Sequence, residues 1–149
     1  LAIVMEYIEG RNLSEMIGSE IGPIPFVRAL ELFRQVLEAT EYAHDRGVIH
    51  RDLKPSNVMV THDGITRIMD FGIAKITGSA GHTRTGTKLG TLYYMSPEQI
   101  KGARDVDKRA DIYSLGMTLY EMLAGRLPFD TGDETSEWAI TQKIVLDEY

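Results

Sequence analysis

The octet His50-Arg51-Asp52-Leu53-Lys54-Pro55-Ser56-Asn57 gathers an acid, a lysine and an amide in one short stretch of the chain. Thirteen residues after Asn57 the chain reads Asp70-Phe71-Gly72, which adds a second acid. A third stretch begins at Gly90-Thr91 and ends at Ser96-Pro97-Glu98. Two carboxylates, a lysine and an asparagine on two nearby loops form the set that can hold metal ions and a phosphate against a hydroxyl group.

Together, the three stretches resemble the catalytic loop, the metal-binding loop and the end of the activation segment of a protein kinase. Ser96-Pro97-Glu98 stands where that family usually has Ala-Pro-Glu, and the surrounding run is most similar to bacterial serine/threonine kinases of the eukaryotic type. The resemblance implies an α+β protein-kinase-like fold, whose large lobe is mainly helical with short β-hairpins. It covers the whole chain as a partial catalytic domain. Residues 1–10 are expected to be the end of the small lobe and the hinge, and residues 11–149 a large lobe that is incomplete at its C-terminus.

Composition and charge restrict the possible functions. The chain has 149 residues, of which 43% are hydrophobic and 26% charged, so it can form one globular domain with a core. Its net charge of −6 argues against a nucleic-acid partner, because such surfaces are normally basic. The absence of cysteine excludes disulfides, thiolate nucleophiles and zinc sites built on cysteine. A metal is therefore expected on oxygen ligands, which suits Mg²⁺ or Mn²⁺.

Apolar periodicity predicts two long helices on either side of the motifs. The first spans residues 26–46, starts after Pro25 and ends at Gly47. Its predicted buried face carries Phe26, Leu30, Phe33, Leu37 and Thr40, with Ala29, Val36, Ala39 and Ala43 beside them. The second spans residues 107–124 and is apolar nearly all round, so it is expected to be central and buried. Strands at 58–60 and 65–69 are predicted to form a hairpin around an Asp-Gly turn. The remaining elements are predicted as a strand at 1–5, a polar connection at 6–10, a helix near 13–17 capped by Asn12, a loop at 18–25, a mobile loop at 77–91 and a helix at 135–146.

The resemblance implies a role for each reactive group. Asp52 accepts the proton of the substrate hydroxyl or orients that hydroxyl, and Lys54 stabilises charge on the transferred phosphoryl group. Asn57 and Asp70 bind metal ions, with Asp70 chelating the ion that bridges the nucleotide phosphates. Thr91 contacts Asp52 and Lys54. Together, Thr91 and Lys54 favour serine or threonine over tyrosine as the acceptor.

Further residues are implied to support this site. His50 is expected to pack and to form hydrogen bonds without transferring a proton, and Asp111 is expected to hold the backbone of the catalytic loop. Phe71 would pack against the core and Gly72 would let the chain turn sharply. Glu98 would form a structural ion pair with an arginine further along the chain.

Regulation is implied by Arg51, which precedes the catalytic acid as in kinases that are controlled by phosphorylation of the activation segment. A phosphate on Thr83, Thr85 or Thr87 would pair with Arg51 and order the loop. A solvated polar loop explains the same threonines equally well, so none of the three is singled out.

The stretch Met5-Glu6-Tyr7-Ile8 resembles the hinge that binds adenine in kinases. The carbonyl of Glu6 and the amide of Ile8 would pair with the adenine edge, and Met5 would lie at the back of the pocket. Leu13 and Met59 would pack on the two faces of the ring. An ordinary strand end followed by a polar loop is the alternative interpretation. The resemblance thus implies ATP as cofactor, with Mg²⁺ or Mn²⁺.

The function implied by these motifs is transfer of the ATP γ-phosphoryl group to serine or threonine hydroxyls of a protein substrate, by a longer parent protein. The sequence contains no Gly-rich phosphate loop and no Val-Ala-Ile-Lys strand, so the excised stretch is expected to be inactive without a small lobe in cis. Two alternatives remain open, a kinase-like binding module without catalysis and a small-molecule phosphotransferase of related fold. No signal peptide or membrane-spanning stretch is recognised, so the expected location is the cytoplasm, with any membrane anchor of the parent outside this segment.

Overall fold

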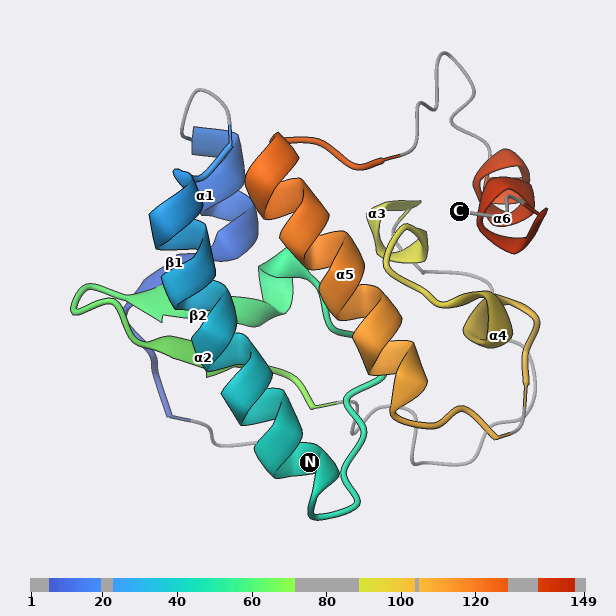
Figure 1. The fold of residues 1–149 in the computed structure, drawn as a ribbon, viewed down its shortest axis with the longest axis horizontal. Helices are drawn as coiled ribbons and strands as arrows, with labels where there is room; N and C mark the ends of the chain where they lie inside the picture. The colour runs from blue at the N-terminus through green and yellow to red at the C-terminus, as the bar shows by residue number, and fades with distance from the viewer. Residues whose placement is uncertain (1–5, 20–22, 72–88, 104, 129–136, 147–149) are drawn as a thin grey trace.

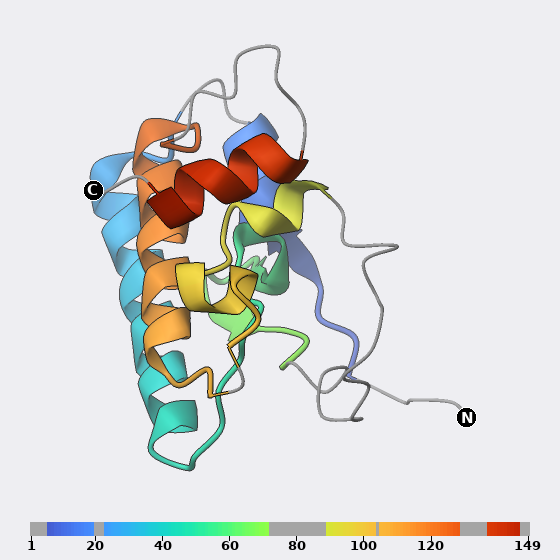
Figure 2. The same ribbon diagram turned by 90° about the vertical axis from the view of Figure 1, so that its right-hand side faces the viewer.

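Two long helices pack together along one side of the molecule (Figures 1 and 2). The structure is a computed structural model that describes residues 6–19, 23–71, 89–103, 105–128 and 137–146. Helix α2 (Phe26–His44) and helix α5 (Arg109–Ala124) lie side by side and run in opposite directions. The amide of Ile24 donates to the carbonyl of Met122 at 2.9 Å, so the start of α2 is tied to the end of α5.

A three-stranded antiparallel sheet packs against α2, in the order β1 (Gly10–Asn12), β2 (Val58–Thr61) and β3 (Thr66–Ile68). Strands β2 and β3 form the predicted hairpin, and Gly64 adopts a φ of 81° in its turn. The side chain of Gln35 on α2 holds this hairpin, because its Nε2 donates to the carbonyl of Gly64 at 3.1 Å and its Oε1 accepts from the amide of Thr66 at 2.9 Å. Strand β1 was not predicted, since Gly-Arg-Asn has no apolar alternation and becomes a strand only by pairing with β2.

Helix α1 (Leu13–Ser19) begins with the predicted cap. The amide of Glu15 donates to Oδ1 of Asn12 at 2.8 Å, and the amide of Asn12 donates to Oε2 of Glu15 at 3.1 Å. These reciprocal bonds satisfy two amides that the first turn of a helix leaves without a partner.

The buried face of α2 agrees with the prediction at Ala29, Phe33, Val36, Thr40 and Ala43 and differs at its outer edge. Phe26, Leu30 and Leu37 are 64%, 43% and 44% exposed, so their predicted burial is wrong. The buried residues are Ala29, Leu32, Phe33, Val36, Thr40 and Ala43. Two neighbouring apolar stripes run along this helix, and periodicity does not say which of them faces the sheet and α5.

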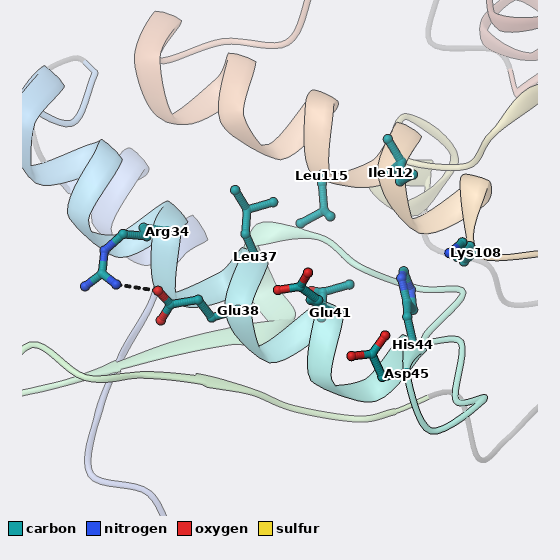
Figure 3. Close-up of a pocket in the computed structure, with 10 residues that line it drawn as sticks. Arg34, Leu37, Glu38, Glu41, His44, Asp45, Lys108, Ile112 and Leu115 are labelled. Atoms are coloured by element: carbon teal, nitrogen blue, oxygen red, sulfur yellow. Dashed lines mark hydrogen bonds and ion pairs between the residues drawn. The ribbon is translucent and has the colours of Figure 1, made fainter.

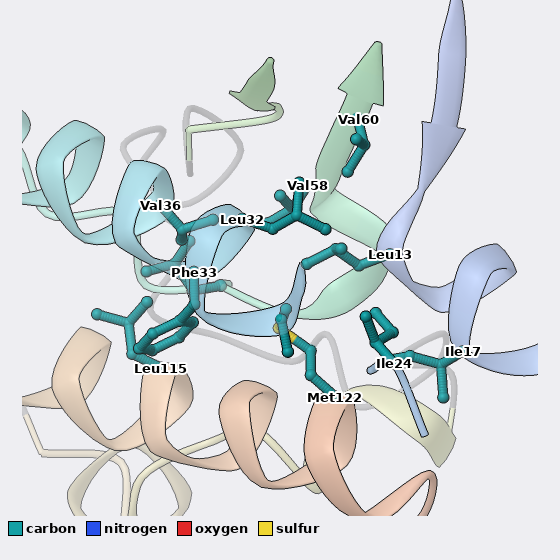
Figure 4. Close-up of a cluster of buried hydrophobic side chains, with 12 residues drawn as sticks. Leu13, Ile17, Ile24, Leu32, Phe33, Val36, Val58, Val60, Leu115 and Met122 are labelled. Atoms are coloured by element: carbon teal, nitrogen blue, oxygen red, sulfur yellow. The ribbon is translucent and has the colours of Figure 1, made fainter. Parts of the chain in front are cut away.

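The core joins α1, α2, β2 and α5 (Figure 4). Its buried members are Leu13, Ile17, Ile24, Ala29, Leu32, Phe33, Val36, Leu53, Val58, Val60, Leu115 and Met122. Helix α5 is central, as predicted, but it is not buried all round, since Ile112 and Tyr120 are 58% and 40% exposed. Gly125 ends α5 in the left-handed conformation with a φ of 67°.

Four short elements complete the described fold: η1 (Pro55–Asn57), α3 (Leu89–Leu92), α4 (Pro97–Ile100) and α6 (Glu137–Leu146). Helix α6 packs on α3 and α4 (Figure 2) and buries Ile140 and Ile144. Residues 89–91 lie in α3, so their prediction as the end of a loop at 77–91 is wrong. The rest of that loop, residues 77–88, lies outside the described ranges. The predicted strand at 1–5 lies outside them as well. Within the described ranges, no helix combines the length and apolar character needed to cross a bilayer.

Candidate active site

The octet is held from behind by Asp111, which lies in the first turn of α5 and is fully buried. Its Oδ2 accepts from the amide of His50 at 2.9 Å, and its Oδ1 accepts from the amide of Arg51 at 2.7 Å. The predicted contact between Asp111 and the backbone of the octet is therefore confirmed. His44, at the end of α2, also lies 2.8 Å from Oδ2 through its Nε2. This third partner was missed, because a histidine at the end of an amphipathic helix carries no signal in sequence.

The backbone is strained at two residues that flank the reactive groups. Arg51 has a φ of 65° and Asp70 a φ of 53°, and neither is glycine. The surroundings hold Arg51 in this conformation, since its amide is bound by Asp111 and its carbonyl accepts from Nε2 of Gln99 at 2.8 Å. The contact with Gln99 was not predicted.

His50 connects the two motif loops and is almost fully buried. Its Nε2 lies 2.8 Å from the carbonyl of Met69, and its Nδ1 accepts from the amide of Asp52 at 3.2 Å. Its ring centroid lies 4.9 Å from that of Phe71. These partners assign the ring proton to Nε2 and leave no ring nitrogen for proton transfer, which agrees with the predicted supporting role.

The reactive groups of the octet converge on the Asp52 carboxylate. Nζ of Lys54 lies 3.1 Å from Oδ2 of Asp52 and 3.1 Å from Oγ1 of Thr91, so the predicted contact between Lys54 and Thr91 is present. Nδ2 of Asn57 donates to the Asp52 carbonyl at 2.8 Å and to Oδ2 at 3.2 Å. The Asp52 side chain remains 31% exposed. The Asp52 carboxylate is thus held at Oδ2 by a cation and an amide, while its side chain stays partly open to solvent.

Asn57 and Asp70 provide oxygen atoms for a cation. Because Asp52 takes the amide nitrogen of Asn57, the amide oxygen is the atom left to bind a metal. Asp70 is exposed and follows Met69, whose amide donates to the carbonyl of Asn57 at 2.8 Å, so the two side chains arise from adjoining turns. No cluster of three or more acids or histidines that could hold a metal occurs in the part of the chain that is described. The donor set fits Mg²⁺, which usually takes one or two protein oxygens and completes its shell with water and phosphate.

The predicted adenine contacts are only partly supported by burial. Glu6 is exposed, and Ile8 and Met59 are half-buried, which leaves them accessible to a ligand. Leu13 is fully buried in the core beside Ile17, so the prediction that it packs on an adenine ring is wrong. It is the first residue of α1, and the cap on Asn12 directs it inward.

The side chains of two further predicted residues, Glu98 and Arg51, make few polar contacts with the described residues. Glu98 is half-buried and forms no ion pair with any described residue. The guanidinium of Arg51 makes few hydrogen bonds within the described ranges. Its Nε is buried and has no partner there, and one terminal nitrogen lies 3.4 Å from the carbonyl of Val106. Met5, Gly72, Thr83, Thr85 and Thr87 lie outside the described residues.

A groove of about 390 Å³ lies between α2 and α5 and contains none of the predicted site residues (Figure 3). Its apolar lining is Leu37, Ile112 and Leu115, and its acidic lining includes Glu41 and Asp45. It meets the candidate active site only through His44, whose Nε2 binds Asp111.

Two hydrogen bonds that the sequence did not predict connect the Gly90–Glu98 stretch to α5. The hydroxyl of Tyr94 donates to Oε2 of Glu121, and Oγ of Ser114 donates to the carbonyl of Tyr94 at 2.7 Å. Burial raises the pKa of Glu121 above its ordinary value, although the hydrogen bond from Tyr94 opposes this. Burial, together with the Glu121 acceptor, also raises the pKa of the Tyr94 phenol, so it stays protonated.

The raised pKa of Glu121 predicts a specific pH dependence of stability. A carboxyl group whose folded-state pKa is raised adds stability that is complete below its unfolded pKa and is lost as pH rises through the folded pKa. Glu121→Gln keeps an acceptor for Tyr94 but does not titrate. Between about pH 4 and pH 7 the urea midpoint of the wild type should therefore fall relative to that of Glu121→Gln. Exposed Glu41→Gln is the control, and a wild-type-to-Gln difference that stays constant across this range would contradict the assignment.

Comparison with known proteins identifies the family to which the chain belongs. The chain matches the family model described as the protein kinase domain over residues 1–148. It is 49% identical over 129 residues to a probable serine/threonine-protein kinase of Streptomyces coelicolor, covering 85% of this chain and 19% of the relative. It is 44% identical over 133 residues to the serine/threonine-protein kinase PknB of Mycobacterium tuberculosis, covering 88% of this chain and 21% of the relative.

A probable serine/threonine-protein kinase of Clostridium acetobutylicum is 44% identical over 134 residues, which cover 90% of this chain and 20% of the relative. The chain thus spans about a fifth of the length of the curated relatives that it matches. Because the family model matches almost every residue and the motif residues lie together in space, the chain belongs to the protein kinase domain family.

Proposed function

We propose that this chain carries the catalytic centre of a serine/threonine protein kinase, which transfers the γ-phosphoryl group of ATP to a hydroxyl group of a protein substrate. One observation carries the proposal. Lys54 bridges the Asp52 carboxylate and the Thr91 hydroxyl with both contacts at 3.1 Å, which is the arrangement needed to place an acceptor hydroxyl beside a cation. The names of the three relatives point to the same acceptor class.

Asp52 is suited to receive the substrate hydroxyl. Lys54 and Asn57 fix Oδ2 from the protein side, while the exposed part of the carboxylate orients the hydroxyl and accepts its proton. The ammonium group of Lys54 would stabilise negative charge on the phosphoryl oxygens as the new bond to oxygen forms. Thr91 keeps that ammonium group in place.

Bound ATP would supply the phosphoryl group, and Mg²⁺ would neutralise charge on its phosphates. On this chain, the amide oxygen of Asn57 and the carboxylate of Asp70 would hold the metal. The carbonyl of Glu6 and the amide of Ile8 would hold the adenine edge, with Met5 and Met59 beside the ring. The half-buried state of Met59 supports this placement.

Regulation by phosphorylation is part of the proposal. The buried Nε of Arg51 has no hydrogen-bond partner among the described residues, and buried polar groups are normally satisfied. A phosphate on Thr83, Thr85 or Thr87 would supply acceptors to this guanidinium and so order the segment between Asp70-Phe71-Gly72 and Gly90.

We also propose that the chain corresponds to the end of the small lobe and the hinge (residues 1–10) followed by large-lobe residues. The sequence contains no Gly-rich loop and no Val-Ala-Ile-Lys strand, so the groups that grip the ATP phosphates from above would come from other residues of the intact protein.

The test is phosphoryl transfer by the intact protein. Incubation with radiolabelled ATP, Mg²⁺ and casein, followed by acid hydrolysis and separation of the phosphoamino acids, should yield phosphoserine or phosphothreonine. Absence of label from any protein would favour a binding module without catalysis. Label found only in small-molecule acceptors would favour a phosphotransferase of related fold.

Asp70→Ala should weaken nucleotide binding by about tenfold or more in the presence of Mg²⁺, which corresponds to ~1.4 kcal/mol, and should leave metal-free binding nearly unchanged. The reason is that a direct carboxylate ligand acts only through the ion. Calorimetric titration with ADP, with and without Mg²⁺, measures both affinities. Asp63→Ala removes an exposed carboxylate from the turn between β2 and β3, the strand that precedes Asp70, and is the matched control. Equal losses with and without Mg²⁺ would show that Asp70 is a structural residue.

A further inference from the structure

Both ends of the Gln99 side chain are engaged. Gln99 is the third residue of α4, and its Oε1 accepts from the amide of Ser96 at 3.1 Å and from the Ser96 hydroxyl at 3.3 Å. Its Nε2 donates to the carbonyl of Arg51 at 2.8 Å. These partners fix the orientation of the amide, because only its nitrogen can donate to a carbonyl. One side chain therefore joins the start of α4 to a loop that lies 48 residues earlier in the chain.

The carbonyl that Gln99 binds belongs to the peptide group between Arg51 and Asp52. The amide of the same peptide donates to Nδ1 of His50 at 3.2 Å, so the peptide plane is held at both ends. Arg51 itself has a φ of 65°, a conformation that persists only where the surroundings enforce it. The direction in which the Asp52 side chain leaves the backbone depends on this peptide plane.

We propose that Gln99 is a positioning residue for Asp52, acting through the Arg51 carbonyl. This inference rests on the kinase function proposed above and adds a residue to it. Thr91 and Gln99 belong to the same described stretch, residues 89–103, and reach Asp52 by two routes. Thr91 acts through the ammonium group of Lys54, which contacts the carboxylate, and Gln99 acts through the backbone behind it. A shift of this stretch would therefore change both the charge partner and the direction of the Asp52 carboxylate.

The capping role of Gln99 can be separated from its contact with Arg51. Of the two polar atoms of the Gln99 side chain, only Oε1 takes part in the cap of α4. Glutamate serves equally well as an acceptor at this position of a capping box. Gln99→Glu thus keeps the cap, removes the donor to Arg51 and places a carboxylate against its carbonyl. Gln99→Met removes both contacts without adding charge. Ser96→Ala removes the hydroxyl from the cap and leaves the contact between Gln99 and Arg51 in place.

The experiment compares kcat, the KM for ATP and the melting temperature of the intact wild-type protein and the three variants. Gln99→Glu and Gln99→Met should each lower kcat by about tenfold, because misplacing a reacting group costs rate, and should leave the KM for ATP unchanged. Ser96→Ala should lower the melting temperature without lowering kcat. A merely structural role would instead make kcat follow the melting temperature in all three variants.

Wild-type kcat in the Gln99 variants, or a loss of kcat in Ser96→Ala that matches its loss of stability, would overturn the inference while leaving the kinase function intact. A wild-type protein that transfers no phosphate in the same assay would overturn the proposed function, and the role of Gln99 with it. The two failures are therefore distinguishable.

Discussion

Asp52→Asn is expected to lower the rate of phosphoryl transfer by the intact protein about 10²–10⁴-fold while ATP affinity stays nearly unchanged. Lys54 and Asn57 both contact Oδ2 of Asp52, and the side chain is 31% exposed, so a substrate hydroxyl can reach the carboxylate. Asparagine keeps the size of the side chain and one acceptor oxygen, but it cannot accept the proton and has no charge to pair with Lys54. The loss should therefore appear in kcat.

Single-turnover transfer and ATP titration, measured on the same preparation, separate the two quantities. The matched control is Asp45→Asn, which changes an exposed acid just after α2 that contacts no reactive group. Unchanged turnover in Asp52→Asn would show that another group positions the hydroxyl.

Asp111→Ala is expected to lower the free energy of unfolding by roughly 3–5 kcal/mol and to abolish transfer. The substitution leaves three donors in a buried place without an acceptor: the amides of His50 and Arg51, and Nε2 of His44. It also frees Arg51 from the contact that holds its positive φ, so the octet would relax away from its active geometry.

Urea unfolding measures the loss of stability, and Asp105→Asn, an exposed acid shortly before α5, is the control. Asp111→Asn should lie between the wild type and Asp111→Ala, since one acceptor oxygen remains. A change below about 1 kcal/mol for Asp111→Ala, which is the range of exposed substitutions, would mean that water replaces the carboxylate.

The parts of the fold that could be predicted are those with a local physical signal. The turn at Gly64 and the cap at Asn12 were predicted because each depends on residues within a few positions along the chain. The residues of the octet were identified differently, through the resemblance of the three stretches to the motifs of a protein kinase. The buried face of α2 could not be predicted, because Leu30 and Leu37 are as apolar as the residues that are buried.

The contacts that sequence could not reveal are those between distant residues. Gln99 with Arg51, His44 with Asp111, and Tyr94 with Glu121 join residues that are 48, 67 and 27 positions apart. Each involves a polar side chain of a common type, and no periodicity marks its partner. Leu13 failed as an adenine contact for a related reason, since the same apolar side chain suits a ligand pocket and a core equally well.

The contacts of Asp111 with the octet also fix the order in which the molecule can be assembled. During synthesis His50 and Arg51 are made about sixty residues before the carboxylate that binds their amides. Closing a loop of that length costs entropy, which the packing of α5 on α2 and α1 helps to offset. The octet is thus a short motif in the sequence, but its backbone conformation depends on Asp111, which lies about sixty residues later in the chain. It should be among the last parts of the domain to form, and a nascent chain that ends before Asp111 would carry the catalytic side chains without their geometry.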